Sequence, residues 1–222
     1  MRRRFLAAAL LWGAAAFAWP ASRVRIAALG DSTTAGAPHF LSPLEAPPDG
    51  KGDPESQYAY WMMRRHPDWE VINDGISGQR SDQIALRLED ALKAGPQMVI
   101  ILAGVNDIVQ GVPLRETEER LLWMYRRAKA MTVVPVAATV LPYDQATPEQ
   151  AQEIRRLNAW IRKTSDKERI PLADLNRALA DPQHPDRLIG SDDGIHPDVG
   201  GYRTMGEALA DTVQPLTDIG RH

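Results

Sequence analysis

The chain of 222 residues contains no cysteine. Disulfides therefore cannot stabilise the fold, and neither a cysteine nucleophile nor a lipid-modified N-terminal cysteine is available. The histidines lack the spacing of metal ligands, so the sequence contains no pattern typical of a zinc site. A phosphate-binding loop and a dinucleotide-binding glycine pattern are missing as well. We expect no cofactor, no metal and a fold stabilised by its hydrophobic core alone.

An excess of positive charge is also missing. The formal net charge is -3, which gives no reason to expect a nucleic-acid partner. Hydrophobic residues make up 44% of the chain and charged residues 25%, a balance typical of a soluble globular protein. The length suits one well-filled core and is short for two. We therefore predict a single domain over residues 22–222.

The chain also lacks a hydrophobic run long enough to be an ordinary membrane span. The most apolar segment covers residues 5–19 and follows three arginines at positions 2–4. A span needs about 20 residues, whereas a basic start followed by a shorter apolar stretch is typical of a secretory signal peptide. A retained membrane anchor is the alternative.

Small residues near the end of this segment suggest where it is removed. Cleavage after Ala18 or Ala21 fits, so we predict a signal peptide over residues 1–21. The paired arginines also resemble a twin-arginine export signal. We expect an exported protein, periplasmic or secreted, without stable membrane insertion once the signal is removed.

Five apolar runs alternate with amphipathic stretches along the rest of the chain. Continuous Val, Ile and Leu runs suit parallel strands that are covered on both faces. The expected strands lie at 24–29, 69–72, 98–103, 132–140 and 170–175. The expected helices lie at 58–65, 81–94, 114–130, 148–167 and 200–213, with Ser81 and Thr147 as N-terminal caps. This order predicts one α/β domain with a parallel sheet and right-handed crossovers.

Residues 36–57 are rich in Pro and Gly and show no periodicity. We expect a structureless loop here, and loops of this length are often functional. Because it follows the first strand directly, it is a candidate wall for a substrate pocket, together with residues 141–147. A flexible surface insertion is the alternative.

Three residues have the chemistry of a serine nucleophile and its activation. Ser32 follows the first strand in a Gly-Asp-Ser turn, and His196 stands in an Asp-Gly-Ile-His-Pro stretch. A free serine hydroxyl is a weak nucleophile and needs a base, which His196 can supply. Asp193 is close enough in sequence to orient the imidazole and stabilise its charged form. Each residue also has a plainer interpretation, a helix cap for Ser32 and a surface loop for His196.

Two further residues are candidate donors for an oxyanion. Gly78 permits a close approach of the backbone, and Asn106 offers a side-chain amide. With the backbone N–H of Ser32 they would form three donors for the charge that develops on a carbonyl oxygen. Both also suit ordinary turns after strands. The neighbouring aspartates Asp31, Asp74, Asp107 and Asp192 are expected to stabilise turns.

Four stretches in this order resemble those of the SGNH hydrolases, also called GDSL-type esterases. The stretches are Gly30-Asp31-Ser32, Asn73 to Gly78, Gly104-Val105-Asn106-Asp107 and Asp193-Gly194-Ile195-His196. The chain is especially similar to small periplasmic thioesterases, lysophospholipases and arylesterases. Thr33 stands where the motif name has Leu, and Val105 stands where Gly is frequent.

The resemblance implies a fold and an activity. It implies a three-layer α/β/α domain whose five-stranded parallel sheet has the flavodoxin-like order 2-1-3-4-5. It also implies hydrolysis of a small-molecule carboxylic ester through an acyl-serine, with Ser32, Asp193 and His196 catalytic and Ser32, Gly78 and Asn106 forming the oxyanion hole. We expect short acyl chains.

Three alternatives to this activity remain. The first is a carbohydrate O-acetylesterase, and the second is a lysophospholipase or thioesterase acting on longer chains. The third is an inactive carbohydrate- or lipid-binding module on the same fold. The sequence leaves the oligomeric state open.

Overall fold

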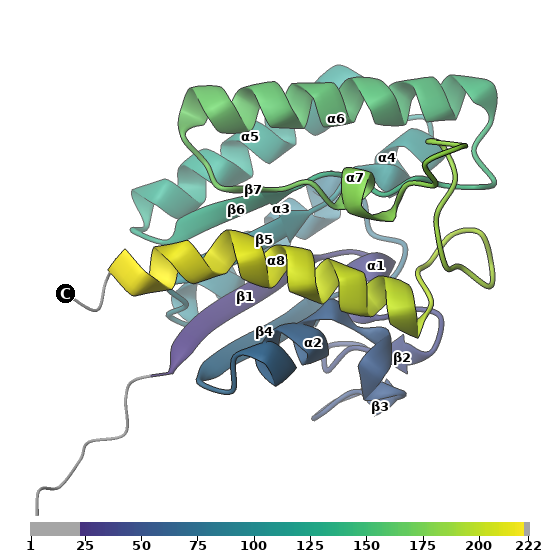
Figure 1. Ribbon diagram of the computed structural model, residues 1–222. Helices are drawn as coiled ribbons and strands as arrows, with labels where there is room; N and C mark the ends of the chain where they lie inside the picture. The colour runs from purple at the N-terminus through teal and green to yellow at the C-terminus, as the bar shows by residue number, and fades with distance from the viewer. Residues whose placement is uncertain (1–22, 220–222) are drawn as a thin grey trace, which may run out of the picture.

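The computed structural model describes residues 23–219, which form a central five-stranded parallel sheet (Figure 1). The strands are β1 (Val24–Gly30), β4 (Trp69–Gly75), β5 (Met98–Leu102), β6 (Val134–Ala138) and β7 (Leu172–Ala173), in the order β4-β1-β5-β6-β7. Counted along the chain, this is the predicted order 2-1-3-4-5. The predicted signal peptide over residues 1–21 lies outside the described residues.

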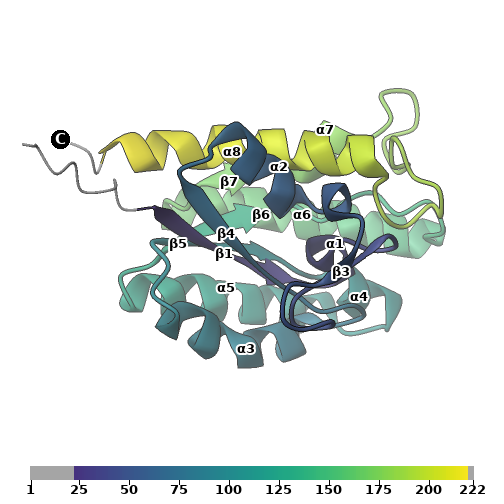
Figure 2. The ribbon, with the colours of Figure 1, turned by 90° about the horizontal axis from the view of Figure 1, so that it is seen from below.

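Helices cover both faces of the sheet, which confirms the three layers (Figure 2). One face packs against α2 (Tyr58–Arg65), α7 (Leu175–Leu179) and α8 (Val199–Ile219), and the other against α3 (Ser81–Lys93), α5 (Leu114–Ala130) and α6 (Pro148–Glu168). Within β1, Ile26 and Ala28 join the first core and Ala27 and Leu29 the second. Because alternate residues of a strand point to opposite faces, a strand buried twice has a continuous apolar sequence.

The helix ends agree with the predictions to different degrees. Thr147 caps α6 as expected: its hydroxyl accepts the Gln150 N–H, and the Gln150 side chain accepts the Thr147 N–H. The prediction for Ser81 is wrong, because Arg80 occupies the cap position of α3 and Ser81 bonds to Asp107 instead. Helix α8 continues to Ile219, beyond the predicted end at residue 213.

Residues 36–57 are not structureless. They include β2 (Phe40–Leu41) paired antiparallel with β3 (Lys51–Gly52), and the 3-10 turn η1 (Pro54–Ser56). Two-residue strands are too short to show periodicity in the sequence, which is why they escaped prediction. The segment lies beside α1 (Ser32–Ala35) and α2 (Figure 2).

All five strands of the sheet run in one direction, so their carboxyl ends meet at one edge, on the right in Figure 1. Ligands of open α/β sheets bind at this edge. The short helices α1 and α4 (Val105–Val109) start there, directly after β1 and after β5. Of the helices within residues 23–219, none is both long and apolar enough to cross a membrane.

Candidate active site

Ser32 stands at the point where β1 turns into α1. Asp31 is buried and caps this short helix, because its carboxylate accepts the Thr33 N–H at 3.0 Å. A side chain at Gly30 would place its β-carbon 2.1 Å from the Thr34 hydroxyl oxygen, so only glycine fits there. Ser32 is thereby held at the first position of a helix that a buried strand fixes in place.

The structure brings Ser32, His196 and Asp193 together. The Ser32 Oγ lies 2.9 Å from the His196 Nε2, and the His196 Nδ1 lies 2.7 Å from the Asp193 Oδ2. An ionised Asp193 only accepts hydrogen bonds, so the Nδ1 carries the proton and the Nε2 is free to accept one from the Ser32 hydroxyl. This is the tautomer that general-base catalysis requires.

Asp193 also organises the loop that carries it. Its Oδ1 accepts the N–H groups of Ile195 at 2.8 Å and of His196 at 2.7 Å. Burial alone would raise the pKa of Asp193, but the bonds from the His196 N–H, the His196 ring and the Ile195 N–H outweigh it and lower the pKa to about 2. The carboxylate therefore stays ionised throughout the pH range in which proteins are usually studied.

Ser191 closes the same loop from the other side. Its hydroxyl donates to the His196 carbonyl oxygen at 2.6 Å and accepts the Gly194 N–H at 2.9 Å. Gly194 has a φ of 71°, a conformation that favours glycine. The position of the acid–base pair thus depends on a few local hydrogen bonds within residues 191–196.

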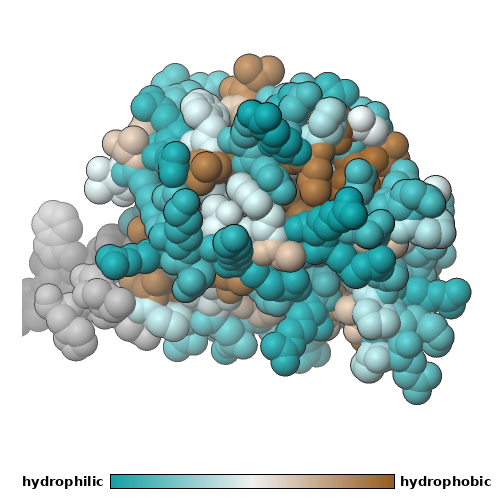
Figure 3. Space-filling model, turned by 90° about the horizontal axis from the view of Figure 1, so that it is seen from above, coloured by the Kyte–Doolittle hydropathy of each residue, from teal (hydrophilic) through white to brown (hydrophobic). Residues whose placement is uncertain are grey.

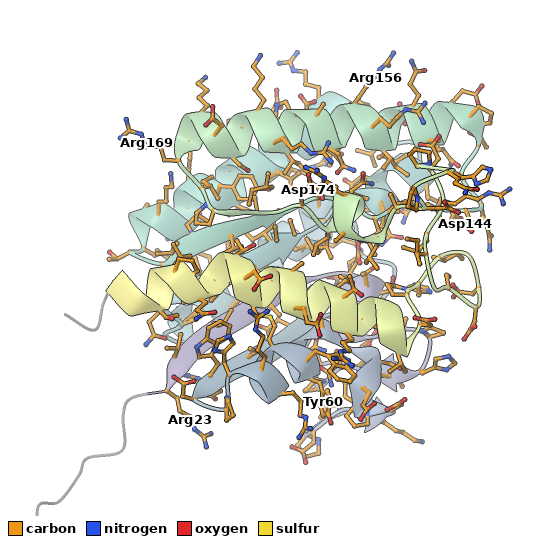
Figure 4. The ribbon with its side chains drawn as sticks, viewed as in Figure 1. Arg23, Tyr60, Asp144, Arg156, Arg169 and Asp174 are labelled. Atoms are coloured by element: carbon orange, nitrogen blue, oxygen red, sulfur yellow. The ribbon has the colours of Figure 1, made fainter. Side chains whose placement is uncertain are left out.

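Residues 144 and 145 support the loop of residues 191–196 through hydrogen bonds. The Asp144 N–H donates to the Gly194 carbonyl oxygen at 2.9 Å, and the Asp144 Oδ1 accepts the Leu188 N–H at 2.7 Å. The Gln145 side chain donates to the Asp193 carbonyl oxygen at 2.8 Å. Figure 4 shows Asp144 among the loops at the strand-end edge, far from α2. Asp144 has no signal in the sequence, because its partners lie more than 40 positions away.

Gly78 and Asn106 lie in neighbouring segments that follow β4 and β5. The Asn106 Nδ2 donates one hydrogen to the Gln79 carbonyl oxygen at 3.0 Å, which leaves the second hydrogen of the amide for a ligand. Gly78 has a φ of 75°, and a β-carbon built there meets nothing within 4 Å. Glycine is therefore needed at position 78 for its backbone conformation and not for space.

Asp107 has a larger role than the stabilisation of a turn that the sequence predicts for it. It is fully buried, and its carboxylate accepts the Ser81 N–H at 2.8 Å and the Ser81 hydroxyl at 2.5 Å. The Thr117 hydroxyl donates to it at 3.2 Å. Asp107 thus joins α4 to the start of α3, and so holds the segments of Asn106 and Gly78 side by side.

A cavity of about 320 Å³ opens beside these groups. Its polar side contains Ser32, Gly78, Asn106 and His196. Its apolar side comes from the ends of β5 and β6 and from α4, and is lined by Leu102, Ala103, Val105, Val109, Val140 and Leu141. Figure 3 shows a largely hydrophilic face with hydrophobic side chains gathered toward the strand-end side, at the right.

The predicted pocket wall is partly wrong. Within residues 36–57 only Ala37 lines the cavity, because the segment packs instead against α2 and α8 and bonds to the end of β4. Within residues 141–147, Leu141, Pro142 and Tyr143 line it, as expected.

Two asparagines, the buried Asn158 and the half-buried Asn176, fix the backbone of the apolar wall after β6. The Asn158 side chain accepts the Val140 N–H and donates to the Val140 carbonyl oxygen, both at 2.8 Å. The Asn176 amide donates to the same oxygen at 2.9 Å. The backbone N–H and carbonyl oxygen of Val140 therefore both have hydrogen-bond partners, although Val140 lies past the end of β6 and has no strand neighbour there.

The model of the GDSL-like Lipase/Acylhydrolase family matches residues 28–204. The chain belongs to this family. The match includes the strand-end segments and the acid–base loop, and so covers every residue of the site described above. The chain is accordingly a hydrolase with the acylhydrolase and esterase activity general to the family.

Relatives and solved structures agree with this assignment. Thioesterase 1/protease 1/lysophospholipase L1 of Escherichia coli (strain K12) is 26% identical over 169 residues, which cover 73% of this chain and 78% of the relative. A GDSL-like lipase from Bacteroides thetaiotaomicron superposes with a TM-score of 0.69 at 26% identity, covering 91% of this chain and 94% of that one.

A member of the lipolytic protein G-D-S-L family from Veillonella parvula has the same fold at only 15% identity. Its TM-score is 0.71, and the match covers 86% of this chain and 98% of that one.

Proposed function

We propose that this acylhydrolase is a serine esterase that cleaves carboxylic esters with short acyl chains through an acyl-serine intermediate. The observation that carries the proposal is the continuous chain of contacts from Asp193 through His196 to Ser32, with the Ser32 Oγ 2.9 Å from the His196 Nε2 beside an apolar cavity.

The first half of the reaction acylates Ser32. The Ser32 oxygen attacks the ester carbonyl carbon while the His196 Nε2 takes its proton, and the carbonyl π electrons move onto the oxygen. The Ser32 and Gly78 N–H groups and the second hydrogen of the Asn106 amide stabilise this oxyanion. When it collapses, the C–O bond to the alcohol breaks and His196 returns the proton to the leaving alcohol.

The second half releases the acid. A water attacks the acyl-serine carbonyl carbon and gives its proton to the His196 Nε2, which forms a second oxyanion in the same place. Collapse breaks the bond to Ser32, and the serine oxygen takes the proton back from His196. Asp193 stabilises the imidazolium in both halves through the bond to its Nδ1.

The size of the cavity supports a preference for short acyl chains. About 320 Å³ lies at the low end of the range of ligand pockets, about 300–1,000 Å³. An acyl group of a few carbons gains about 0.8 kcal/mol for each methylene that the apolar side buries. An acetyl group on a sugar would fit the same space, so carbohydrate O-acetylesterase activity belongs to this proposal as a special case.

A second candidate is a thioesterase or lysophospholipase that acts on longer chains. The name of the E. coli relative favours it, since that protein is called a thioesterase and a lysophospholipase. One feature of this protein also favours the second candidate. Val109 lines the cavity and is partly exposed, so a long acyl chain could extend out of the cavity across the Val109 side chain.

Two measurements test the proposal. Treatment with a fluorophosphonate should add one adduct mass to the peptide containing Ser32, and a Ser32→Ala variant should take no label and lose turnover. If the wild type takes no label and hydrolyses no ester, the protein is an inactive binding module.

The kcat/KM on p-nitrophenyl esters from acetyl to palmitoyl, with acetylated sugars alongside, should peak between acetyl and about hexanoyl. A value for palmitoyl equal to that for butyryl would favour the second candidate.

We also propose that the protein is exported. Three arginines at positions 2–4 and the apolar residues 5–19 support this. Expression of the full chain should yield an extracytoplasmic product whose N-terminus follows Ala18 or Ala21. An unprocessed product that stays with the cells would contradict the proposal.

A further inference from the structure

Arg87 reaches the base of the site from the middle of α3 without lining the cavity. Its guanidinium donates three hydrogen bonds to three different segments. The Nη2 donates to the Gly30 carbonyl oxygen at 3.0 Å, the Nη1 to the Asp74 carbonyl oxygen at 2.7 Å, and the Nε to the Gln79 Oε1 at 2.9 Å. One side chain thus connects the ends of β1 and β4 with the loop that follows β4.

Two of the three acceptors, Gly30 and Gln79, stand close in sequence to residues of the site. Gly30 ends β1, two residues before Ser32, and Gln79 directly follows Gly78. The Gln79 carbonyl oxygen also accepts the hydrogen bond of the Asn106 Nδ2. Arg87 therefore contacts the residue that lies between the two donors Gly78 and Asn106, and at the same time the strand that carries the nucleophile.

The loop is held from its other end by Glu45. The Glu45 Oε1 accepts the Ser77 N–H at 2.7 Å, and its Oε2 accepts the Ser42 N–H at 3.1 Å. Residues 77–79, which we call the oxyanion loop, are thus attached to the 36–57 segment at one end and to Arg87 at the other. The loop itself is largely exposed, so these polar contacts and not burial fix its position.

Arginine is better suited than lysine to donate hydrogen bonds to three segments at once. Its planar guanidinium presents five N–H donors in fixed directions, whereas a lysine ammonium is a compact point charge. Burial lowers the pKa of Arg87, although the charges of Asp74 and Glu45 oppose the shift. The side chain is therefore kept in a half-buried place that is unfavourable for a cation unless its hydrogen bonds are all made.

We propose that Arg87 is a positioning residue for the oxyanion hole: it fixes Gln79, and thereby aligns the Gly78 N–H and the Asn106 amide on one point beside Ser32. The inference rests on the proposed function and extends it to a residue outside the cavity. A small displacement of donors that act in the transition state lowers turnover and leaves substrate binding largely intact.

The first test compares Arg87→Met, Arg87→Lys and Gln79→Ala with Arg156→Met. Arg156 is an exposed arginine on α6 that points away from the protein in Figure 4, so its variant is the matched control. For Arg87→Met we expect kcat to fall about 10- to 100-fold with KM within about twofold. Arg87→Lys should recover little of this, Gln79→Ala should lose a smaller part, and Arg156→Met should match the wild type.

The second test is a double-mutant cycle with Asn106→Ala. If Arg87 acts by aligning the Asn106 amide, then Asn106→Ala should lower kcat much less in the Arg87→Met background than in the wild type. A residue that merely supports the fold would give effects that multiply. Should Arg87→Met fail to fold, the same cycle is run with Gln79→Ala.

Failure of the inference and failure of the proposed function give different results. Multiplicative effects, a rise in KM at unchanged kcat, or an equal loss in Arg156→Met would overturn the role of Arg87 while Ser32-dependent turnover remains. If Ser32→Ala keeps its turnover, the proposed function itself is wrong. The double-mutant cycle would then give no information about an oxyanion hole.

Discussion

The two halves of the site are built in different ways. Ser32 and Asn106 stand in short helices that begin just past the ends of β1 and β5, and the inner residues of both strands are fully buried. Asp193 and His196 stand in the irregular stretch between α7 and α8, whose shape depends on Ser191, on Asp193 itself and on Asp144. The strand-end half is placed by the core, whereas the loop half is placed by a few hydrogen bonds.

This difference predicts two kinds of failure. Damage to the core should lower the free energy of unfolding and leave turnover largely intact as long as the protein stays folded. Damage to the loop should lower turnover in a protein that remains stable. Five substitutions test the contrast, and they follow in order of decreasing effect.

Asp193→Asn should have the largest effect. An amide at this position can present its NH₂ group to the His196 ring, which favours the wrong tautomer, and we expect kcat to fall about 10³- to 10⁴-fold. Steady-state kinetics measure the loss, and circular dichroism shows that the fold is kept. Asp192→Asn is the control, because the neighbouring Asp192 side chain is 78% exposed and should matter little. Similar losses in both variants would refute the assignment of Asp193.

Asn106→Ala removes a donor from the strand-end half without disturbing the core. We expect kcat to fall about 10²- to 10³-fold with little change in KM, because the lost bond acts chiefly in the transition state. Initial rates over a range of substrate concentrations separate the two constants. A tenfold rise in KM at unchanged kcat would make Asn106 a substrate-binding residue instead.

Ile101→Ala removes part of the hydrophobic core that holds the strand-end half in place. Ile101 is fully buried in β5, one residue before the strand ends, so its truncation should lower the free energy of unfolding by about 2–5 kcal/mol. Denaturant titration gives this value. Assayed well below its melting temperature, the variant should keep kcat within about threefold of the wild type. A tenfold loss of kcat in the folded variant would show that the core does not isolate the site from such changes.

Ser191→Ala is the converse test on the loop half. It leaves the Gly194 N–H and the His196 carbonyl oxygen without their partner, which costs about 1–3 kcal/mol at a buried group and less at a half-buried one. We expect kcat to fall about tenfold as the His196 ring loses its alignment, with a melting temperature close to that of the wild type. Unchanged turnover would mean that Asp193 and Asp144 hold the loop without Ser191.

Asp31→Asn should have the smallest effect, and only at higher pH. Burial raises the pKa of Asp31 to about 7, helped by the charge of Asp107 and opposed by the bonds from Thr33. The stability gained from holding this proton is fully present below about pH 4 and is lost as the pH rises through 7. Asparagine keeps the capping bond to Thr33 and carries no charge.

The melting temperature of this variant should therefore match that of the wild type at pH 4 and exceed it by a few degrees at pH 8. Asp166→Asn, an exposed change on α6, serves as the control and should shift the melting temperature equally at both values. Asp193 has the opposite linkage: its lowered pKa contributes stability above about pH 4 that is lost toward pH 2. An Asp31 variant with the same pH dependence as the wild type would contradict the raised pKa.

The sequence predicted those parts whose signal is local. The strands came from continuous apolar runs, and the start of α6 came from Thr147 as cap and Pro148 at the first helical position. The family motifs gave Ser32 and His196, which the structure brings within 2.9 Å although the chain separates them widely.

The parts that were missed depend on contacts between distant segments. The prediction of Ser81 as a cap is wrong because a serine at a helix start gives the same signal whether its hydroxyl bonds to the helix or to Asp107. Arg87 has no signal in the sequence, since none of its three acceptors belongs to α3. The 36–57 segment was expected to wall the cavity, whereas Glu45 supports the oxyanion loop from outside it.

The distance along the chain between Ser32 and His196 has a consequence for protein synthesis. The two residues are 164 positions apart, and the base comes last. Under the proposed mechanism, a growing or truncated chain that ends before residue 196 already contains the nucleophile and all three oxyanion donors, but lacks the base that takes the serine proton. Hydrolysis therefore begins only after nearly the whole chain has been made and its last loop has docked, so the order of the parts itself keeps an unfinished enzyme inert.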